Sequence, residues 1–507
     1  MRLFFFIFLA AAVTVSHAEV IPYETTPGAV ASPSYKLTAD GKPIFVEKFG
    51  DVSYVRFAFS GSAQIQVENL QPIETFSISP QARKIPGTKD GTRLFFPLDQ
   101  PGGVIVTVNS QEKLLILADP PETDAPKLGD AKVRNLEGFL PPNRDPKVPI
   151  TAEFQKALDE VSATGGALYL PHGLYVTGQL KIKSNTHVYL QSGALVQAVP
   201  DPSPQNFPPQ AWDKDSSFIF IGQAQNVKIT GRGIIDGNGG AIRAISPEAK
   251  IKLLRTAASS QILLDGIFLR DSPRWTVHLL HSDDITCRNL KIVNDLRGKA
   301  SGEKLKPIVS NTDAFDIDAS RKVLVEDSFV YTTDDAFSPK VTGYMNLKRS
   351  CKGIVIRRNV LWSLKCAIRI GDETLADLSD ILFENNDIIR ADRFIGLWCG
   401  DACKMSNFRF LDNRAESIGG DSNERFFYFR IRLASPKSKP GTIDHVLVRN
   451  FTALHPARQH STIEGYDTEH EITDVKFENI VIDGHKVESA TDIPLDFKNS
   501  FYRDITF

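Results

Sequence analysis

Three aspartates stand close together in the middle of the chain, in segments that otherwise look like β-strand. Asp313 lies in NTDAFDI, and Asp334 and Asp335 lie in TTDDAF, one short segment later. Aspartate forms strands poorly, and clustered carboxylates repel one another and perturb each other's pKa. A lone aspartate usually serves a turn. A set of three in strand-like sequence favours acid–base chemistry, and we predict a hydrolytic site.

The spacing of these residues predicts how they meet. Asp313 and Asp334 are 21 residues apart, and residues about one coil apart in a stacked β-structure lie above one another, about 4.8 Å apart. We therefore expect Asp313 and Asp334 at equivalent places on adjacent coils, with Asp335 beside the latter. Strict strand alternation would send Asp334 and Asp335 to opposite faces, so we predict a local bend there.

The elements that must position the aspartates recur along the chain as short apolar strands separated by a polar step with Asn, Asp or Gly. Successive units are 23 to 38 residues apart, with starts at residues 262, 285, 323, 354, 381, 408, 446 and 475. A coil period with loop insertions gives such spacing, whereas propellers and leucine-rich repeats have other signatures. The pattern predicts an all-β fold, a right-handed parallel β-helix in which the polar residue bends the strand or adopts αL.

The rest of the chain divides by composition. Residues 1–18 carry an early Arg, an apolar run and a small-residue site, which predicts a signal peptide cleaved after Ala18 and therefore a secreted protein. Residues 19–125 alternate like the strands of a small β-sandwich. Residues 126–149 are rich in Pro, Asp and Gly, which predicts a linker. Residues 150–507 form the expected β-helix domain.

A single amphipathic helix opens that domain. Thr151 is expected to cap it, and Gly165-Gly166 to end it. Such a helix would cover strand edges that otherwise invite aggregation. Its apolar face is predicted to comprise Phe154, Ala157, Leu158 and Val161.

Overall composition restricts the function. The formal net charge is −2 and the sequence pI about 6.6, so there is no global basic field for nucleic acid. No later apolar segment is long enough for a membrane span. Five cysteines are too few for a disulfide framework; Cys399 and Cys403 are either a small disulfide loop or two free thiols. We expect no cofactor and no metal.

An ordered series of motifs resembles the polygalacturonase family, glycoside hydrolase family 28. From about Gly165 to the C-terminus these are GGALYLPHGLYVTGQLKIKSNTHVYLQSGA, GRGIIDGNGG and SPRWTVHL, followed by NTDAFDI and DDAF. A sandwich ahead of a β-helix is also similar to the layout of the family 49 dextranase and isopullulanase relatives. The resemblance implies inverting hydrolysis, in which Asp334 is the general acid while Asp313 and Asp335 hold and deprotonate a water. Acid and base would lie about 6.5 to 9.5 Å apart.

The segments that grip a uronate in polygalacturonases differ here. Cys366, in KCAIRIG, stands where the resemblance places a histidine, and RFIGLWCG replaces the Arg-Ile-Lys segment. Other cations could bind a carboxylate in their place, an aromatic residue could stack on a sugar, and a histidine could line the cleft; each could equally be structural. The candidate substrate-binding residues are His278, Lys340, Arg369, Arg393 and Trp398.

The leading hypothesis is a secreted glycoside hydrolase acting on a polysaccharide or its oligosaccharides. Alternatives are a dextranase/isopullulanase-like α-glucan hydrolase, a polysaccharide lyase that would use carboxylates to hold calcium, and a non-catalytic carbohydrate-binding solenoid. Endo or exo action depends on loops such as residues 294–310.

Overall fold

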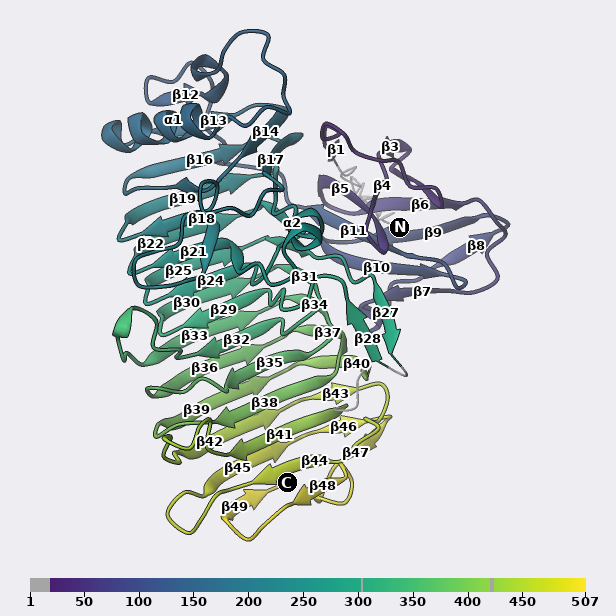
Figure 1. Ribbon diagram of the computed structural model, residues 1–507. Helices are drawn as coiled ribbons and strands as arrows, with labels where there is room; N and C mark the ends of the chain where they lie inside the picture. Colours follow the sequence, from purple (N-terminus) through teal and green to yellow (C-terminus); the bar gives the residue numbers. More distant parts are fainter. Residues whose placement is uncertain (1–18, 302–303, 420–423) are drawn as a thin grey trace, which may run out of the picture.

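Strands run through almost the whole chain, and Figure 1 shows them in two arrangements, a tall solenoid and a smaller β-sandwich at its side. The computed structural model describes residues 19–301, 304–419 and 424–507. The predicted signal peptide lies outside these residues. No helix within them has the length and apolar character needed to cross a bilayer.

The solenoid consists of three long sheets in which each coil contributes one strand to each sheet. Pairing is parallel throughout the described strands except between β46 and β47. The first sheet contains β12 (Val133–Asn135), β13 (Ala167–Leu170), β16 (Thr186–Leu190), β19 (Gln225–Gly231), β22 (Ser260–Asp265), β25 (Asp283–Arg288), β30 (Arg321–Glu326), β33 (Cys351–Arg357), β36 (Leu378–Glu384), β39 (Lys404–Leu411), β42 (Thr442–Arg449), β45 (Ile472–Glu478) and β49 (Tyr502–Thr506).

The second sheet is turned toward the sandwich. It contains β14 (Gly173–Thr177), β17 (Ala194–Ala198), β20 (Ile234–Asp236), β23 (Phe268–Arg270), β26 (Lys291–Val293), β31 (Phe329–Thr332), β34 (Val360–Ser363), β37 (Asp387–Ala391), β40 (Arg414–Ile418), β43 (Thr452–Ala453), β46 (Val481–Ile482) and β47 (His485–Lys486).

The third sheet carries most of the candidate site. It contains β15 (Leu180–Lys181), β18 (Ser216–Gly222), β21 (Ile251–Ala257), β24 (Val277–Leu280), β29 (Phe315–Asp318), β32 (Phe337–Lys340), β35 (Cys366–Gly371), β38 (Arg393–Cys399), β41 (Arg425–Ile431), β44 (Ser461–Glu464) and β48 (Leu495–Phe497). An antiparallel hairpin, β27 (Gly298–Ser301) and β28 (Lys304–Pro307), interrupts the coil just before β29.

The sandwich is built from two sheets of mostly antiparallel strands. One contains β1 (Glu19–Pro22), β5 (Val52–Ser60), β11 (Lys113–Asp119), β10 (Gly102–Val108) and β7 (Phe76–Ser79), with β4 (Glu47–Phe49) beside β5. The other contains β3 (Lys42–Ile44), β2 (Tyr35–Ala39), β6 (Ala63–Asn69), β9 (Arg93–Leu98) and β8 (Thr88–Asp90). The predicted all-β fold, a parallel β-helix preceded by a β-sandwich, is confirmed.

A column of eight left-handed residues lies where successive coils turn from the first sheet toward the second. Each member follows a first-sheet strand and has a φ between 50° and 77°, a conformation that Gly, Asn and Asp adopt most readily. The predicted αL role of the polar step is therefore confirmed. The column comprises Gly266, Asn289, Asp327, Arg358, Asn385, Asp412, Asn450 and Asn479.

The helices are few in the described residues. They are α1 (Thr151–Thr164), α2 (Gly239–Ile245) and the 3-10 turns Gln81–Arg83, Leu136–Phe139 and Tyr344–Asn346. Helix α1 covers the N-terminal end of the solenoid (Figure 1). Its predicted apolar face is buried, and it ends at Gly165 with a φ of 66°.

Two local expectations are wrong. Thr151 does not cap α1: the N-cap position is Ile150, and the Thr151 hydroxyl accepts a hydrogen bond from Gly178 N at 2.8 Å, which ties the helix to the first coil. The segment expected to be an irregular linker contains β12, which pairs with β13 and so starts the first sheet.

An apolar interface joins the sandwich to the second solenoid sheet. Residues of β5, β10 and β11 form one buried cluster with residues of β17, β20, β23, β26, β31 and β34. The rings of Tyr54 and Phe268 meet edge to face at 5.1 Å, and Arg270 pairs with Glu47 at 2.7 Å. The sandwich therefore packs against the solenoid through buried apolar side chains and a buried ion pair.

Candidate active site

The three aspartates lie in two consecutive turns that lead into neighbouring strands of the third sheet. Asp313 precedes β29, and Asp334 and Asp335 lie in the bend between β31 and β32. Each offers a carboxylate oxygen within 4.8 Å of the others. The strand register pairs Phe315 with Phe337, an offset of 22 residues, so Asp335 and not Asp334 is level with Asp313.

Phenylalanine packing keeps this register. The rings of Phe315 and Phe337 stack inside the solenoid with centroids 5.3 Å apart and planes at 11°. Backbone bonds continue the ladder into the turns: Ala314 N donates to Asp335 O at 3.0 Å, and Ala336 N donates to Cys366 O at 2.9 Å. The core therefore holds the two acidic turns one above the other.

Side-chain hydrogen bonds shape the bend that the sequence predicted at Asp334. Thr312 and Thr333 share a hydroxyl bond of 2.7 Å between the two turns. Ser363 Oγ donates to the carbonyl of Asp334 at 2.7 Å, and Asp335 N donates to Asp334 Oδ1 at 2.9 Å. These bonds satisfy turn groups that a regular strand would have paired, so both carboxylates can turn to the same side.

The environments of the three carboxylates differ. Asp313 and Asp335 are only 2% and 1% exposed, whereas Asp334 is partly exposed. Burial raises the pKa of Asp334, and the charge of Asp335 raises it further. Burial and the charge of Asp334 raise the pKa of Asp313 well above its ordinary range. The cluster therefore retains protons at a pH where free aspartates are ionised.

Asp335 differs because a cation lies beside it. Burial alone would raise its pKa, but the charges of Arg369, Arg393 and Lys340 and the hydrogen bond from Cys366 N together outweigh burial and lower it. Arg369 Nε lies 2.8 Å from Asp335 Oδ2, and Cys366 N donates to the other oxygen at 2.9 Å. Asp335 is thus held as an anion next to an acid that keeps its proton.

Arg369, Arg393 and Trp398 converge on this side of the trio. The two guanidiniums lie 5.4 and 5.3 Å from the Trp398 ring centre, within cation–π range. Arg393 Nε donates to Cys366 Sγ at 3.1 Å, and burial raises the pKa of that thiol to about 12. Cys366 is therefore a neutral acceptor for Arg393 and has no acid–base role.

His278 and Lys340, expected to bind substrate, are buried side chains of the third sheet. They are 0% and 1% exposed. His278 Nε2 lies 3.2 Å from Asp318 Oδ2, and Lys340 Nζ lies 2.7 Å from Asp316 Oδ1. Both face outward on the ladder, but Trp275 and Tyr344 pack over them. A sugar cannot contact either side chain in this structure.

Cations and an aromatic ring on β41 extend the site, and sequence reasoning did not select them. The register places Arg425 beside Arg393, Tyr428 beside Gly396 and Arg430 beside Trp398. Arg425 and Arg430 flank the Tyr428 ring at 4.6 and 5.4 Å. The sequence offered one signal for these residues: in RFFYFRIR, polar side chains alternate with apolar ones, so Tyr428 and Arg430 fall on the same face of the sheet as Trp398.

The paired thiols at the end of β38 are reduced. Cys399 and Cys403 are buried and their sulfurs are 3.3 Å apart without a bond. Of the two possibilities that the sequence left open, the structure has free thiols.

Comparison with known proteins agrees with this geometry. Residues 166–352, which include all three aspartates, match the family described as Glycosyl hydrolases family 28. The chain resembles family 28 glycosyl hydrolases. A probable polygalacturonase of Vitis vinifera is 27% identical over 275 residues, which is 49% of this chain and 54% of that protein. The chain therefore spans about half the length of this curated relative, and 31% of the length of exopolygalacturonase A of Aspergillus niger.

Two solved structures share the fold over nearly the whole chain. The family 28 exopolygalacturonase of Yersinia enterocolitica aligns over 96% of both chains with a TM-score of 0.59 and 15% identity. Dex49A from Penicillium minioluteum aligns over 96% of both chains with a TM-score of 0.61 and 13% identity. The chain therefore has the same overall fold as these two proteins.

Proposed function

We propose that the protein is a secreted, polygalacturonase-like glycoside hydrolase that cleaves O-glycosidic bonds next to uronate residues in a polysaccharide or its oligosaccharides. The observation that carries this proposal is the convergence of Asp313, Asp334 and Asp335 within 4.8 Å, inside the segment that matches family 28. Secretion rests on the N-terminal sequence of residues 1–18.

The environments of the carboxylates support a division of roles. Asp334 is the general acid, because it reaches solvent and its raised pKa keeps a proton for the leaving oxygen. Asp335, held ionised by Arg369, withdraws the proton of a water that it positions together with Asp313. A single displacement by that water would invert the anomeric centre.

The separation of the acids makes product stereochemistry the decisive measurement. The oxygens lie within 4.8 Å, closer than the roughly 6.5 to 9.5 Å typical of inverting enzymes. Inversion therefore requires the water to lie directly among the carboxylates. Proton NMR of the first product anomer should show inversion; retention would instead make one aspartate a nucleophile and would refute the role given to the water.

The surroundings of the trio favour a uronate substrate over a neutral glucan. Arg393, Arg425 and Arg430 gather around Trp398 and Tyr428 along β38 and β41. Guanidinium groups complement sugar carboxylates, and the aromatic faces provide packing surfaces for sugar rings. The likeness of the fold to a dextranase keeps neutral α-glucans as the second candidate.

A substrate panel tests the proposal. We expect release of reducing ends from polygalacturonate and none from dextran or pullulan. A lyase would instead generate an unsaturated product that absorbs in the ultraviolet, and a binding solenoid would retain polymer without cleaving it. Product sizes over time then distinguish endo from exo action.

A further inference from the structure

A second cavity lies between the sandwich and the solenoid, away from the aspartates. It has a volume of about 490 Å³, within the usual range of small-molecule sites. Tyr331, Trp362 and Arg390 line it from β31, β34 and β37, and Lys113 lines it from the start of β11. Figure 1 shows these solenoid strands on the side turned toward the sandwich.

Two cations flank the indole of Trp362 without a carboxylate partner. Lys113 Nζ lies 4.5 Å from the ring centre and the Arg390 guanidinium lies 5.6 Å from it. Among the residues that the structure describes, no carboxylate oxygen lies within 4.0 Å of either cation. Arg390 Nε donates to Gly419 O at 2.8 Å, and its terminal amino groups have no hydrogen-bond partner among the residues that the structure describes.

Asp51, the acid that lines the same cavity, already accepts hydrogen bonds from other groups. Asp51 accepts hydrogen bonds from Tyr331 Oη at 2.5 Å and from Leu296 N at 2.8 Å. Burial lowers the pKa of Lys113, Asp51 opposes that lowering, and Arg390 adds to it. An anion bound between Lys113 and Arg390 would relieve their mutual repulsion.

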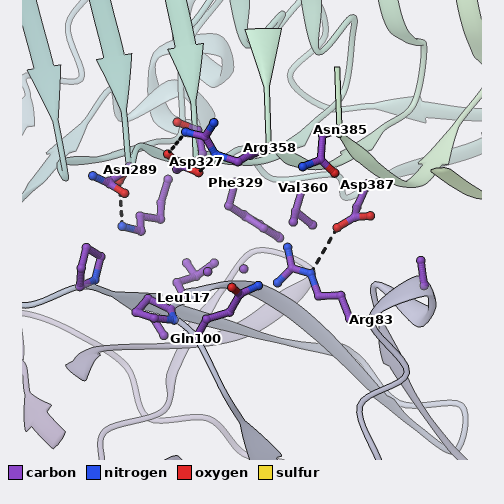
Figure 2. Close-up of a pocket in the computed structure, with 18 of the residues that line it drawn as sticks. Arg83, Gln100, Leu117, Asn289, Asp327, Phe329, Arg358, Val360, Asn385 and Asp387 are labelled. Atoms are coloured by element: carbon purple, nitrogen blue, oxygen red, sulfur yellow. Dashed lines mark hydrogen bonds and ion pairs between the residues drawn. The ribbon is translucent and has the colours of Figure 1, made fainter. Parts of the chain in front are cut away.

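The neighbouring cavity in the same joint provides a contrast. This larger space has a volume of about 670 Å³. Figure 2 shows that two of the cations that line it, Arg83 and Arg358, point at acids. Arg83 lies 3.2 Å from Asp387, and Arg358 lies 2.8 Å from Asp327. Lys291 contacts Asp119 in the same way. Those charges are internally neutralised, as expected of an interface between domains and not of an anion site.

Trp362 adds an independent observation. Its Nε1 is buried and has no hydrogen-bond partner among the described residues. A buried donor without a partner is uncommon. The indole lies between two cations and beside the Tyr331 ring, whose centre is 5.9 Å away, and such a charged and aromatic surface suits a ring that carries carboxylate groups.

We propose that this cavity is a second, non-catalytic site for a uronate oligosaccharide. Trp362 would pack against a sugar ring, and Lys113 and Arg390 would bind its carboxylates. The inference rests on the proposed uronate substrate. Ser363, which follows Trp362, donates to the carbonyl of Asp334, so the cavity lies behind the turn that carries the general acid. A polymer held there would stay at high local concentration near the catalytic turn.

Binding stoichiometry tests the proposal. The Asp334→Asn protein, which should not consume the ligand, is titrated calorimetrically with trigalacturonate. We expect two molecules bound per chain. In the same background, Lys113→Met, Arg390→Met and their combination should remove one of the two binding events, with at least a tenfold loss of affinity at that site. The matched control Arg358→Met, in the ion-paired cavity, should keep both.

Melting temperature checks that each variant remains folded, and Trp362→Phe, which keeps a ring but lacks the donor, provides a milder second variant. A single binding event in the Asp334→Asn protein, or two binding events that both persist in the Lys113→Met/Arg390→Met protein, would overturn this inference and leave the proposed function standing. Equal binding of isomaltotriose at the second site would also overturn it, because that site would then not select charge. No binding at either site would refute the uronate substrate itself.

Discussion

Two groups of aspartates lie in the same two coils, and their neighbouring side chains differ. On β29, Asp316 and Asp318 are accompanied by Lys340 and His278, which lie on neighbouring strands of the same sheet. In the turns just before β29 and β32, three aspartates lie within 4.8 Å of one another, and Asp335 pairs with Arg369. The first group is matched, with an ammonium beside Asp316 and an imidazole beside Asp318 that burial keeps neutral by lowering the pKa of His278, whereas the second group is an excess of acid.

This contrast separates structural acids from chemical ones. A buried carboxylate beside a cation on a regular strand lowers the cost of its own burial and can be explained by stability alone. A cluster whose members raise each other's pKa makes the fold less stable, and such clusters concentrate at functional sites. The residue pairs at equivalent strand positions belong to the first kind, and the turn residues belong to the second.

The largest expected effect lies in the turn group. Asp334→Asn should lower kcat about 10³-fold or more, because the leaving oxygen loses its proton donor. The melting temperature should stay within a few degrees, since the fold no longer contains the like-charge contact with Asp335. Reducing-end assays and thermal denaturation measure the two quantities. Asp284→Asn, at an exposed position of β25, is the control and should change neither; a fully active Asp334→Asn protein would refute the assignment.

The matched group should show the reverse pattern. Lys340→Met leaves Asp316 buried beside a hydrocarbon chain, and removing one partner of a buried ion pair costs about 3 to 5 kcal/mol in the free energy of unfolding. Chemical denaturation measures this loss. The double variant Asp316→Asn/Lys340→Met should recover much of it, because no unpaired charge remains. If the single and double variants were equally unstable, the pair would not be the source of the stability.

Arg369 connects the two groups and should affect the pH profile. Arg369→Met removes the cation that lowers the pKa of Asp335, so that pKa should rise. Since Asp335 must be ionised to accept a proton, the acidic limb of kcat/KM should move to higher pH by about one unit, a tenfold loss at the acidic end. A pH series measures the shift, with Arg358→Met as the control. An unmoved acidic limb would exclude Asp335 as the base.

The sequence predicted much of this arrangement because periodicity and turn chemistry are local. The polar steps that proved to be αL corners, such as those at Asn385 and Asp412, are visible as short polar segments between apolar runs. The three aspartates were found by their improbable strand context. Both signals come from neighbours in the chain.

Contacts between coils were harder to predict. The one-residue register that puts Asp335 level with Asp313 depends on how Phe315 stacks on Phe337, which the spacing alone does not reveal. His278 and Lys340 looked available because nothing in their own strands shows that Trp275 and Tyr344 cover them. Tyr428, two coils beyond Arg369, had no local sign of its nearness to the site.

The smallest expected effect concerns Asp318, the second aspartate of the matched group on β29. Burial raises its pKa from 3.8 to about 6, although Thr342 donates to it from both its hydroxyl, at 2.6 Å, and its backbone N, at 3.0 Å. Between about pH 4 and pH 6 the folded chain therefore binds more protons than the unfolded chain. Asp318 thus makes the free energy of unfolding fall as pH rises, by at most about 1.4 kcal/mol per pH unit.

Asp318→Asn removes this titration, and the free energy of unfolding of the variant should fall less steeply than that of the parent protein between about pH 4 and pH 6. Urea denaturation at several pH values measures the difference in slope. Equal slopes would mean that Asp318 stays ionised in the folded chain. Asp318 would then resemble the ionised Asp335, and protonation state would not distinguish the two groups of aspartates in the way proposed.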